Sequence, residues 1–274
     1  RVISSSSSDF FYLNPMLCCA VALAASVQLR APCSEGTCPA ALPCNIARLD
    51  ALDAEAIFRR DYWGKQPVVV PTQLNEAFRA LTTRESMLGT YGDLPVELST
   101  ANTFTGRAWE KRTLAEYLAS MAAQRNDLAG NNSWYLFGNT YGADWEALLA
   151  AYGEPRLAAL GTGLAFDVNS GATSVSFGLA GFETGVPFHR HADGWSEVIH
   201  GAKRWFLFPP GHTVGHDPNA TTQQWVHAHY AAEATAGALR ECVMRPGNAL
   251  YFPPDWPHAT LNLGEYNAFA STFL

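Results

Sequence analysis

The amino-acid sequence predicts a mainly β fold, a double-stranded β-helix (jelly roll) with N-terminal helices packed on it. From about residue 160 onward, short alternating or apolar runs are separated by Gly and Pro, which is typical of strands joined by turns. Before that point the apolar residues are spaced as in amphipathic helices. The 274-residue chain is 48% hydrophobic and 16% charged, a composition that can build a large core.

The first part of the chain is expected to be largely helical. Asp50 or Asp53 is a suitable N-cap for the first helix, and three more amphipathic runs follow it. The run KQPVVVP predicts a short strand among them. The expected helices cover residues 50–63, 74–81, 111–122 and 144–152, and the expected strand covers residues 65–71.

The second part is expected to supply the jelly-roll strands. We find no internal repeat, so the change near residue 160 indicates a change of class within one domain, expected over residues 48–274. The expected strands lie at residues 174–180, 195–201, 203–210, 240–247, 248–254 and 267–274.

Two segments precede this domain. Residues 1–30 combine a low-complexity start, expected to be disordered, with an apolar run that resembles the hydrophobic region of a signal peptide. The run is short for a bilayer span, and Met16 is a candidate for the true start. Residues 31–47 form a Cys/Pro-rich segment. The expected location is the endoplasmic reticulum lumen or the exterior, with no stable membrane span in the mature chain.

The cysteines and sequons agree with an oxidising compartment. Four cysteines lie outside the apolar run, and the segment CSEGTCPAALPC (33–44), which holds three of them, is rich in turn residues and has no histidine nearby. This favours a disulfide over zinc and leaves the connectivity open. The four cysteines are Cys33, Cys38, Cys44 and Cys242. Glycosylation sequons begin at Asn131 and Asn219 and predict a glycoprotein. The net charge of −7 argues against nucleic-acid binding, which needs clustered Lys and Arg.

The stretch PFHRHADGW (187–195) places two histidines and an aspartate at alternating positions. In an extended strand, residues i and i+2 share a face, so His189, His191 and Asp193 can point the same way. Histidine is the commonest protein ligand for metals. The same alternation is typical of a solvated strand face, so this stretch alone leaves both interpretations open.

A second stretch, PGNALYFPPDWPHATLN (246–262), carries His258 just after a strand and a Pro-rich corner. Closure of a jelly roll can bring such distant positions together. Two ligands from one strand and a third from a later strand leave one face of a metal open. That arrangement suits an oxygen-activating iron, because substrate and dioxygen bind on the open face.

These stretches resemble the JmjC-domain oxygenases of the cupin superfamily over roughly residues 48–274. TGVPFHRH (184–191) is similar to their first ligand strand, GAKRWFLFPP (201–210) to the next strand, and the stretch around His258 to their distal-histidine strand. The signal-like start and the Ser-Thr-Phe-Leu end resemble a short JmjC-only branch of the endoplasmic reticulum lumen. The resemblance implies a cupin-like jelly roll that binds iron(II), or another divalent metal, together with 2-oxoglutarate.

The resemblance also implies roles for single residues. His189 and His258 fall on metal-ligand positions, and Lys203 falls on the residue that pairs with the outer carboxylate of 2-oxoglutarate. Ser196 falls on the inward-facing position of its strand, and we expect it and Asn262 to contact the co-substrate.

The chain departs from the family pattern at the second ligand. JmjC enzymes have His-x-Asp or His-x-Glu, whereas the position two after His189 is His191. Either His191 binds directly, or Asp193 supplies the carboxylate; we favour His191, because Gly194 should end the alternation near Asp193. A wider cupin pattern (His-x-His, Glu, distal His, Asn) offers Glu197 as another ligand. The strand period would turn Glu197 outward if Ser196 faces inward.

Two classes of function follow. The first is an iron(II)- and 2-oxoglutarate-dependent dioxygenase of the secretory lumen, hydroxylating an unknown protein or small molecule. The second is a non-catalytic lumenal protein that binds partners or regulates them on a degenerate site. The sequence leaves the substrate and the oligomeric state open.

Overall fold

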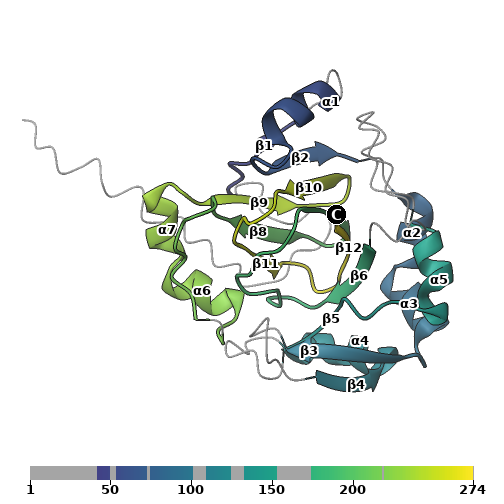
Figure 1. Ribbon diagram of the computed structural model, residues 1–274. Helices are drawn as coiled ribbons and strands as arrows, with labels where there is room; N and C mark the ends of the chain where they lie inside the picture. The colour runs from purple at the N-terminus through teal and green to yellow at the C-terminus, as the bar shows by residue number, and fades with distance from the viewer. Residues whose placement is uncertain are drawn as a thin grey trace, which may run out of the picture.

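The computed structural model describes residues 42–49, 54–72, 75–100, 109–124, 133–152, 174–217 and 219–273 (Figure 1). The expected disordered start and signal-like segment, the first N-cap, Cys33 and Cys38 lie outside these residues. The strands are β1 (Ala47–Arg48), β2 (Val68–Pro71), β3 (Pro95–Thr100), β4 (Trp109–Thr113), β5 (Trp134–Phe137), β6 (Ser174–Ala180), β7 (Gly194–His200), β8 (Lys203–Leu207), β9 (Arg240–Met244), β10 (Asn248–Phe252), β11 (His258–Asn262) and β12 (Asn267–Phe273).

The helices lie mostly in the first half of the chain. They are α1 (Ala54–Ile57), which continues as the π-helix η3 (Phe58–Tyr62), α2 (Glu76–Leu81), α3 (Arg84–Tyr91), α4 (Leu114–Ser120), the 3-10 helix η4 (Met121–Gln124), α5 (Ala143–Ala150), α6 (Thr222–Ala228) and α7 (Tyr230–Ala236). Helices α2, α3 and α5 lie on one side of the molecule, and α6 and α7 lie on the opposite side (Figure 1).

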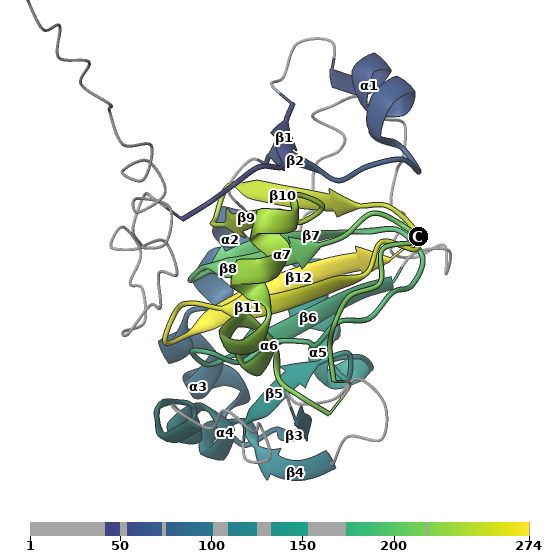
Figure 2. The same cartoon turned by 90° about the vertical axis from the view of Figure 1, so that its left-hand side faces the viewer.

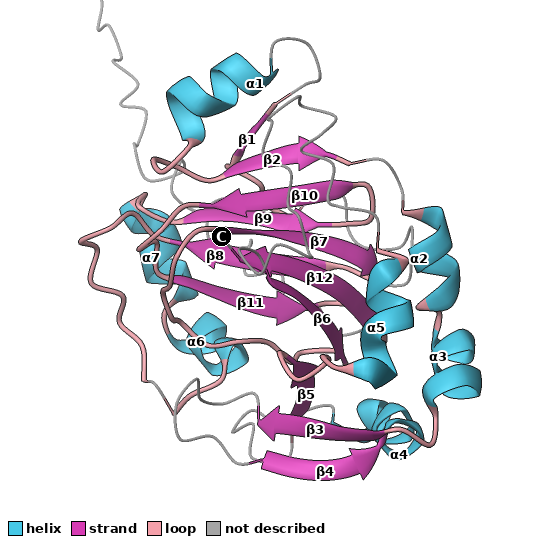
Figure 3. Cartoon of the chain, turned by 45° about the vertical axis from the view of Figure 1, so that its right-hand side comes forward, coloured by secondary structure: helices cyan, strands magenta, loops and turns pink. Residues whose placement is uncertain are grey.

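The strands form a large mixed sheet and a small one, so the predicted mainly β jelly roll is confirmed. The large sheet has nine strands in the order β1-β2-β10-β7-β12-β6-β5-β3-β4, and the small sheet has the order β11-β8-β9. Strands β2, β10, β7, β12 and β6 run side by side across the middle of the molecule (Figure 3). Only β1 and β2 pair in parallel among the described strands.

The inner faces of the two sheets share one apolar core. Val198, Leu250 and Phe252 of the large sheet pack with Trp205 and Leu207 of the small sheet, and all five are buried. Neighbouring residues on each strand point to the opposite face, because side chains alternate along a strand. The inner faces therefore enclose the interior in which the candidate site lies.

Helices cover both outer faces. Phe78 of α2, Leu114 of α4 and Trp145 of α5 pack against Phe177 and Leu179 of the large sheet. On the other side, α6 and α7 pack on the small sheet, in front of it in Figure 2, and contribute the residues Trp225 and Tyr230.

Helix boundaries follow local signals, and one predicted boundary is wrong. The helix predicted over residues 111–122 begins only at Leu114, because residues 109–113 form β4. Thr113 is the N-cap: its hydroxyl accepts from the Glu116 amide, and the Glu116 carboxylate accepts from the Thr113 amide. This reciprocal capping box satisfies two amides that a helix leaves unpaired.

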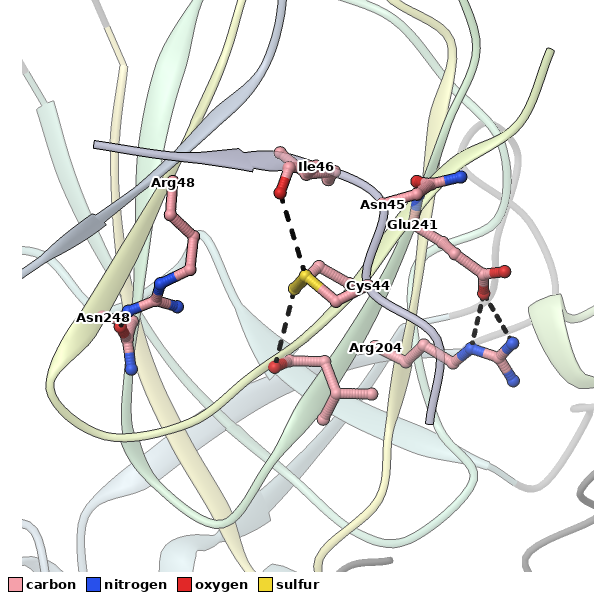
Figure 4. The surroundings of a disulfide bond; sticks show 9 residues. Cys44, Asn45, Ile46, Arg48, Arg204, Glu241 and Asn248 are labelled. Atoms are coloured by element: carbon pink, nitrogen blue, oxygen red, sulfur yellow. Dashed lines mark hydrogen bonds and ion pairs between the residues drawn. A yellow bond between two sulfur atoms is a disulfide. The ribbon is translucent and has the colours of Figure 1, made fainter. Parts of the chain in front are cut away.

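A disulfide between Cys44 and Cys242, 198 residues apart in the chain, fastens the start of the described chain to β9 (Figure 4). Asn45 lies beside it, accepts a hydrogen bond from the Glu241 amide and donates its own amide to Glu241. Arg204 and Glu241 form a buried ion pair next to this junction, with 2.5 Å between Nη2 and Oε2. The pairing shows that at least these two of the four cysteines form a disulfide, as the sequence predicts.

Candidate metal centre

Three imidazoles meet where two distant segments run side by side. His189 and His258 form an antiparallel bridge, in which each backbone amide donates to the other's carbonyl at 3.0 and 2.9 Å. The carbonyl of His191 accepts from the amide of Asp255, which holds the second histidine on the same side. One ring nitrogen from each of His189, His191 and His258 lies within 4.8 Å of the others. Such spacing lets one ion contact all three.

Hydrogen bonds fix the same tautomer in all three rings. Nδ1 of His189 lies 2.8 Å from the carbonyl of Pro187, and Nδ1 of His258 lies 2.8 Å from that of Trp256. Nδ1 of His191 lies 2.6 Å from the carbonyl of Ala192. A carbonyl can only accept, so each Nδ1 carries the proton and each Nε2 keeps its lone pair. This is the backbone support that metal-binding histidines commonly have.

Burial favours the neutral form of two of these rings. It lowers the pKa of His258 well below its ordinary value of 6.5, and the neighbouring His189 and His191 lower it further. Burial also lowers the pKa of His191. A neutral imidazole is the form that binds metals, so the burial of His191 and His258 favours their role as ligands.

Asp193 does not join the three histidines. Its carboxylate accepts a hydrogen bond from the Tyr251 hydroxyl at 3.2 Å, and that hydroxyl accepts from the Gly64 amide at 2.9 Å. Strand β7 begins at Gly194, where a Cβ would lie 2.7 Å from the carbonyl oxygen of Thr272. The close approach explains the glycine, and Asp193 lies at the rim just before the strand.

Glu197 lies on the opposite face of β7 from Ser196. Its carboxylate accepts hydrogen bonds from Thr72 at 2.9 Å and from Tyr152 at 3.1 Å, and Tyr152 belongs to the outer core beneath the helices. Ser196 instead meets Ser271, with 3.0 Å between the hydroxyl oxygens. The alternative of Glu197 as a metal ligand is therefore not supported, because its side chain leaves the interior.

Glu197 makes a pH-dependent contribution to stability. Burial raises the pKa of its carboxyl from 4.5 to about 7, against the hydrogen bonds from Thr72 and Tyr152. The folded chain thus binds the proton more tightly than the unfolded chain, so this contribution is complete below about pH 4.5 and is lost as the pH rises through about 7.

We therefore expect Glu197→Gln to become more stable relative to wild type between about pH 5 and about pH 8, by up to about 3 kcal/mol in the free energy of unfolding. Urea unfolding of both proteins across this range measures the difference. If the free energies of unfolding of the two proteins run parallel across this pH range, the pKa of the Glu197 carboxyl is not raised.

Lys203 is a buried amine without a carboxylate partner among the described residues. Its Nζ donates to the Tyr135 hydroxyl at 3.2 Å and lies 3.4 Å from the centre of the Phe269 ring, with only 3% of the residue exposed. Burial lowers the pKa of Lys203 well below its ordinary value of 10.5. A buried amine of this kind is poised to accept an anionic ligand, because such a ligand would restore the favourable charged state.

Asn262 lies opposite Lys203 in the register of β11 and β8. Its Nδ2 donates to the carbonyl of Thr184 at 2.9 Å, while its buried Oδ1 has no hydrogen-bond partner within the described part of the chain. His258 and Asn262 share the inner face of β11, four residues apart. The histidines and the lysine therefore belong to one interior.

Ser196, which was predicted to face inward, belongs to a row of three serines, and the other two were not predicted. Ser196, Ser271 and Ser176 are register partners on β7, β12 and β6, and the hydroxyl of Ser176 meets that of Tyr141. On β12, Ser271 lies between Phe269 and Phe273, two residues from each. The ring of Phe269 faces the Nζ of Lys203. The ring of Phe273 contacts the ring of His191 edge-on, with 5.0 Å between the ring centres. The alternation along residues 267–274 could have identified Ser271, whereas only the strand pairing shows that Ser176 and Ser196 flank it.

Comparison with known proteins places the chain in a family. It is 40% identical to human JmjC domain-containing protein 8 over 231 residues. The aligned region covers 83% of this chain and 82% of the human protein. The chain belongs to the JmjC domain-containing protein 8 family. The mouse protein of the same name is also 40% identical, over 221 residues.

A more distant relative is the lysine-specific demethylase JMJ21 of Arabidopsis thaliana, 25% identical over 238 residues that make up 24% of that protein. No family model matches the sequence. Within the described residues, no helix is long and apolar enough to cross a membrane.

The interior fits a divalent metal and a dicarboxylate in two respects, and it departs from the JmjC ligand pattern in one. Three Nε2 lone pairs converge, and the ammonium position of Lys203 lacks an anion. The departure is the absence of a carboxylate among the described residues around the three histidines. His189, His191 and His258 could hold the metal, and Lys203 could hold the far carboxylate.

Proposed function

We propose that this chain is an iron(II)- and 2-oxoglutarate-dependent oxygenase of the hydroxylase type. One observation carries the proposal: three imidazoles present Nε2 to a common point in the same interior as a buried lysine that lacks a carboxylate partner. Membership of a JmjC family supports it. The substrate would be a protein or a small molecule.

Each residue group has a distinct task under this proposal. The three histidines hold the metal on one side and leave the other side to ligands. Lys203 pairs with the far carboxylate of 2-oxoglutarate, and the hydroxyls of Ser196 and Ser271 lie between the two ends. Phe269 and Phe273 exclude water beside these hydroxyls. The bound iron and 2-oxoglutarate supply the oxidising chemistry, while the protein supplies binding and orientation.

Single-turnover decarboxylation tests the proposal. The protein is loaded with iron(II) without oxygen, given labelled 2-oxoglutarate and then exposed to air; we expect release of labelled carbon dioxide. His191→Asp restores the carboxylate of the family pattern and should raise the yield. A metal-loaded wild-type protein that releases none would contradict the proposal.

One observation favours the second candidate, a non-catalytic protein that binds or regulates partners. His191 stands where the JmjC pattern has a carboxylate, so the site departs from that of the active family. Under this alternative the wild-type protein stays inactive in the decarboxylation assay, and the fold serves as a binding scaffold.

We further propose that the protein works in the lumen of the secretory pathway. A disulfide between Cys44 and Cys242 is the kind of bond that oxidising compartments maintain. The sequon residue Asn219 is exposed, and Thr221 follows it at the N-cap of α6. Endoglycosidase treatment of protein from cells should increase its mobility on a gel. Unglycosylated protein with Cys44 and Cys242 as free thiols would contradict this location.

A further inference from the structure

The three ligand positions bring no negative charge to a bound metal. Each imidazole is a neutral ligand, since its Nδ1 proton is held by a backbone carbonyl of Pro187, Ala192 or Trp256. A divalent ion held by these rings keeps its full charge. A carboxylate at the position of His191 would have removed one unit of it.

No acidic side chain among the described residues compensates for this. Asp193 is bound at the rim by the Tyr251 hydroxyl, and Glu197 lies on the other face of β7 with Thr72 and Tyr152. The three neutral imidazoles share this interior with the buried amine of Lys203, so the described side chains bring no negative charge to balance a bound metal.

The charges remain unbalanced when a dicarboxylate is added. A divalent metal and the ammonium of Lys203 together carry three positive charges, and 2-oxoglutarate brings two negative ones. One positive charge then stays at a partly buried centre beside the buried Phe252 and Phe269 and the half-buried Phe273. Such a charge is strongly unfavourable without a partner.

We propose that the three-histidine centre binds a small monoanion next to the metal, either a halide or a single carboxylate, in place of the acidic side chain that the chain lacks. This inference rests on the proposed metal site. A halide would come from solution, and a carboxylate would come from an acidic group of the substrate. In both cases the anion balances the charge that His191 leaves uncompensated.

Cobalt(II) provides a readout that is independent of activity. The wild-type protein is loaded with one equivalent of cobalt(II) in chloride-free buffer with 2-oxoglutarate. Sodium chloride or sodium formate is then titrated in, with sodium perchlorate holding the ionic strength constant. We expect a saturable change in the visible absorption of the cobalt. Tighter binding of chloride identifies the halide source, and tighter binding of formate identifies a carboxylate source.

Two variants test the cause. His191→Asp should bind cobalt(II) and should bind the added anion about tenfold more weakly or worse, because its carboxylate removes the excess charge. Asp193→Asn is the matched control and should keep the wild-type response, since Asp193 lies at the rim.

Three results would overturn the inference alone: a cobalt spectrum that responds to neither anion, equal anion affinity in wild type and His191→Asp, or a response that Asp193→Asn abolishes. A wild-type protein that binds no cobalt(II) contradicts instead the metal site and the proposed function. The wild-type titration stands by itself if His191→Asp does not fold.

Discussion

Replacing His258 with alanine should lower the affinity for a divalent transition metal by at least about 100-fold, since even the loss of a residue that orients a ligand costs about 10–100-fold. His258 is buried, and its Nδ1 donates to the carbonyl of Trp256, so its Nε2 is fixed as one of the three ligand atoms. His189→Ala should have the same effect. Isothermal titration with cobalt(II) and the metal content of purified protein measure the loss.

The neighbouring carboxylate is the internal control for this experiment. Asp193→Ala should leave the metal affinity within a few-fold of wild type, whereas His191→Ala should reduce it strongly, because only His191 lies with the other two imidazoles. If Asp193→Ala is the more damaging change, the metal is held by a His-x-Asp arrangement. Circular dichroism of each variant confirms that it is folded.

Replacing Lys203 with methionine should weaken the binding of 2-oxoglutarate by about 2–5 kcal/mol, more than tenfold, because the far carboxylate would be buried without its partner. The stability of the ligand-free protein, in contrast, should not decrease. Lys203 has no carboxylate partner among the described residues, so an apolar side chain of similar shape should leave its stability unchanged or raise it.

Thermal unfolding separates these two effects. Lys203→Met should keep or raise the melting temperature of the ligand-free protein and should lose the stabilisation that 2-oxoglutarate gives to the metal-loaded wild type. Tyr135→Phe, which removes only the hydroxyl near Nζ, should retain most of that stabilisation. A Lys203→Met protein that binds 2-oxoglutarate normally would exclude the proposed role of the lysine.

Local periodicity determined much of the fold. The alternation and Gly/Pro spacing after residue 160 predicted strands β6, β7, β8, β9, β10 and β12, because burial of one face leaves a two-residue pattern in the sequence. The helical pattern likewise predicted α1, α2, α4 and α5. The elements that were missed are β1, β3, β4, β5, α3, α6 and α7. The capping box of α6, formed by Thr221 and Gln224, is nevertheless visible in the sequence.

The sequence by itself determined the jelly-roll class, because strand periodicity is a short-range pattern, and it named the candidate residues of the centre through the His-x-His spacing and the resemblance to JmjC domains. Only the tertiary structure decided that His191, and not Asp193 or Glu197, lies with His189 and His258. The physical reason is that orientation depends on where β7 begins and on which strands flank it. The tertiary structure likewise decided two other features: the disulfide between Cys44 and Cys242, and the row of Ser176, Ser196 and Ser271. Each joins segments that are distant in the chain and adjacent only in the folded sheets.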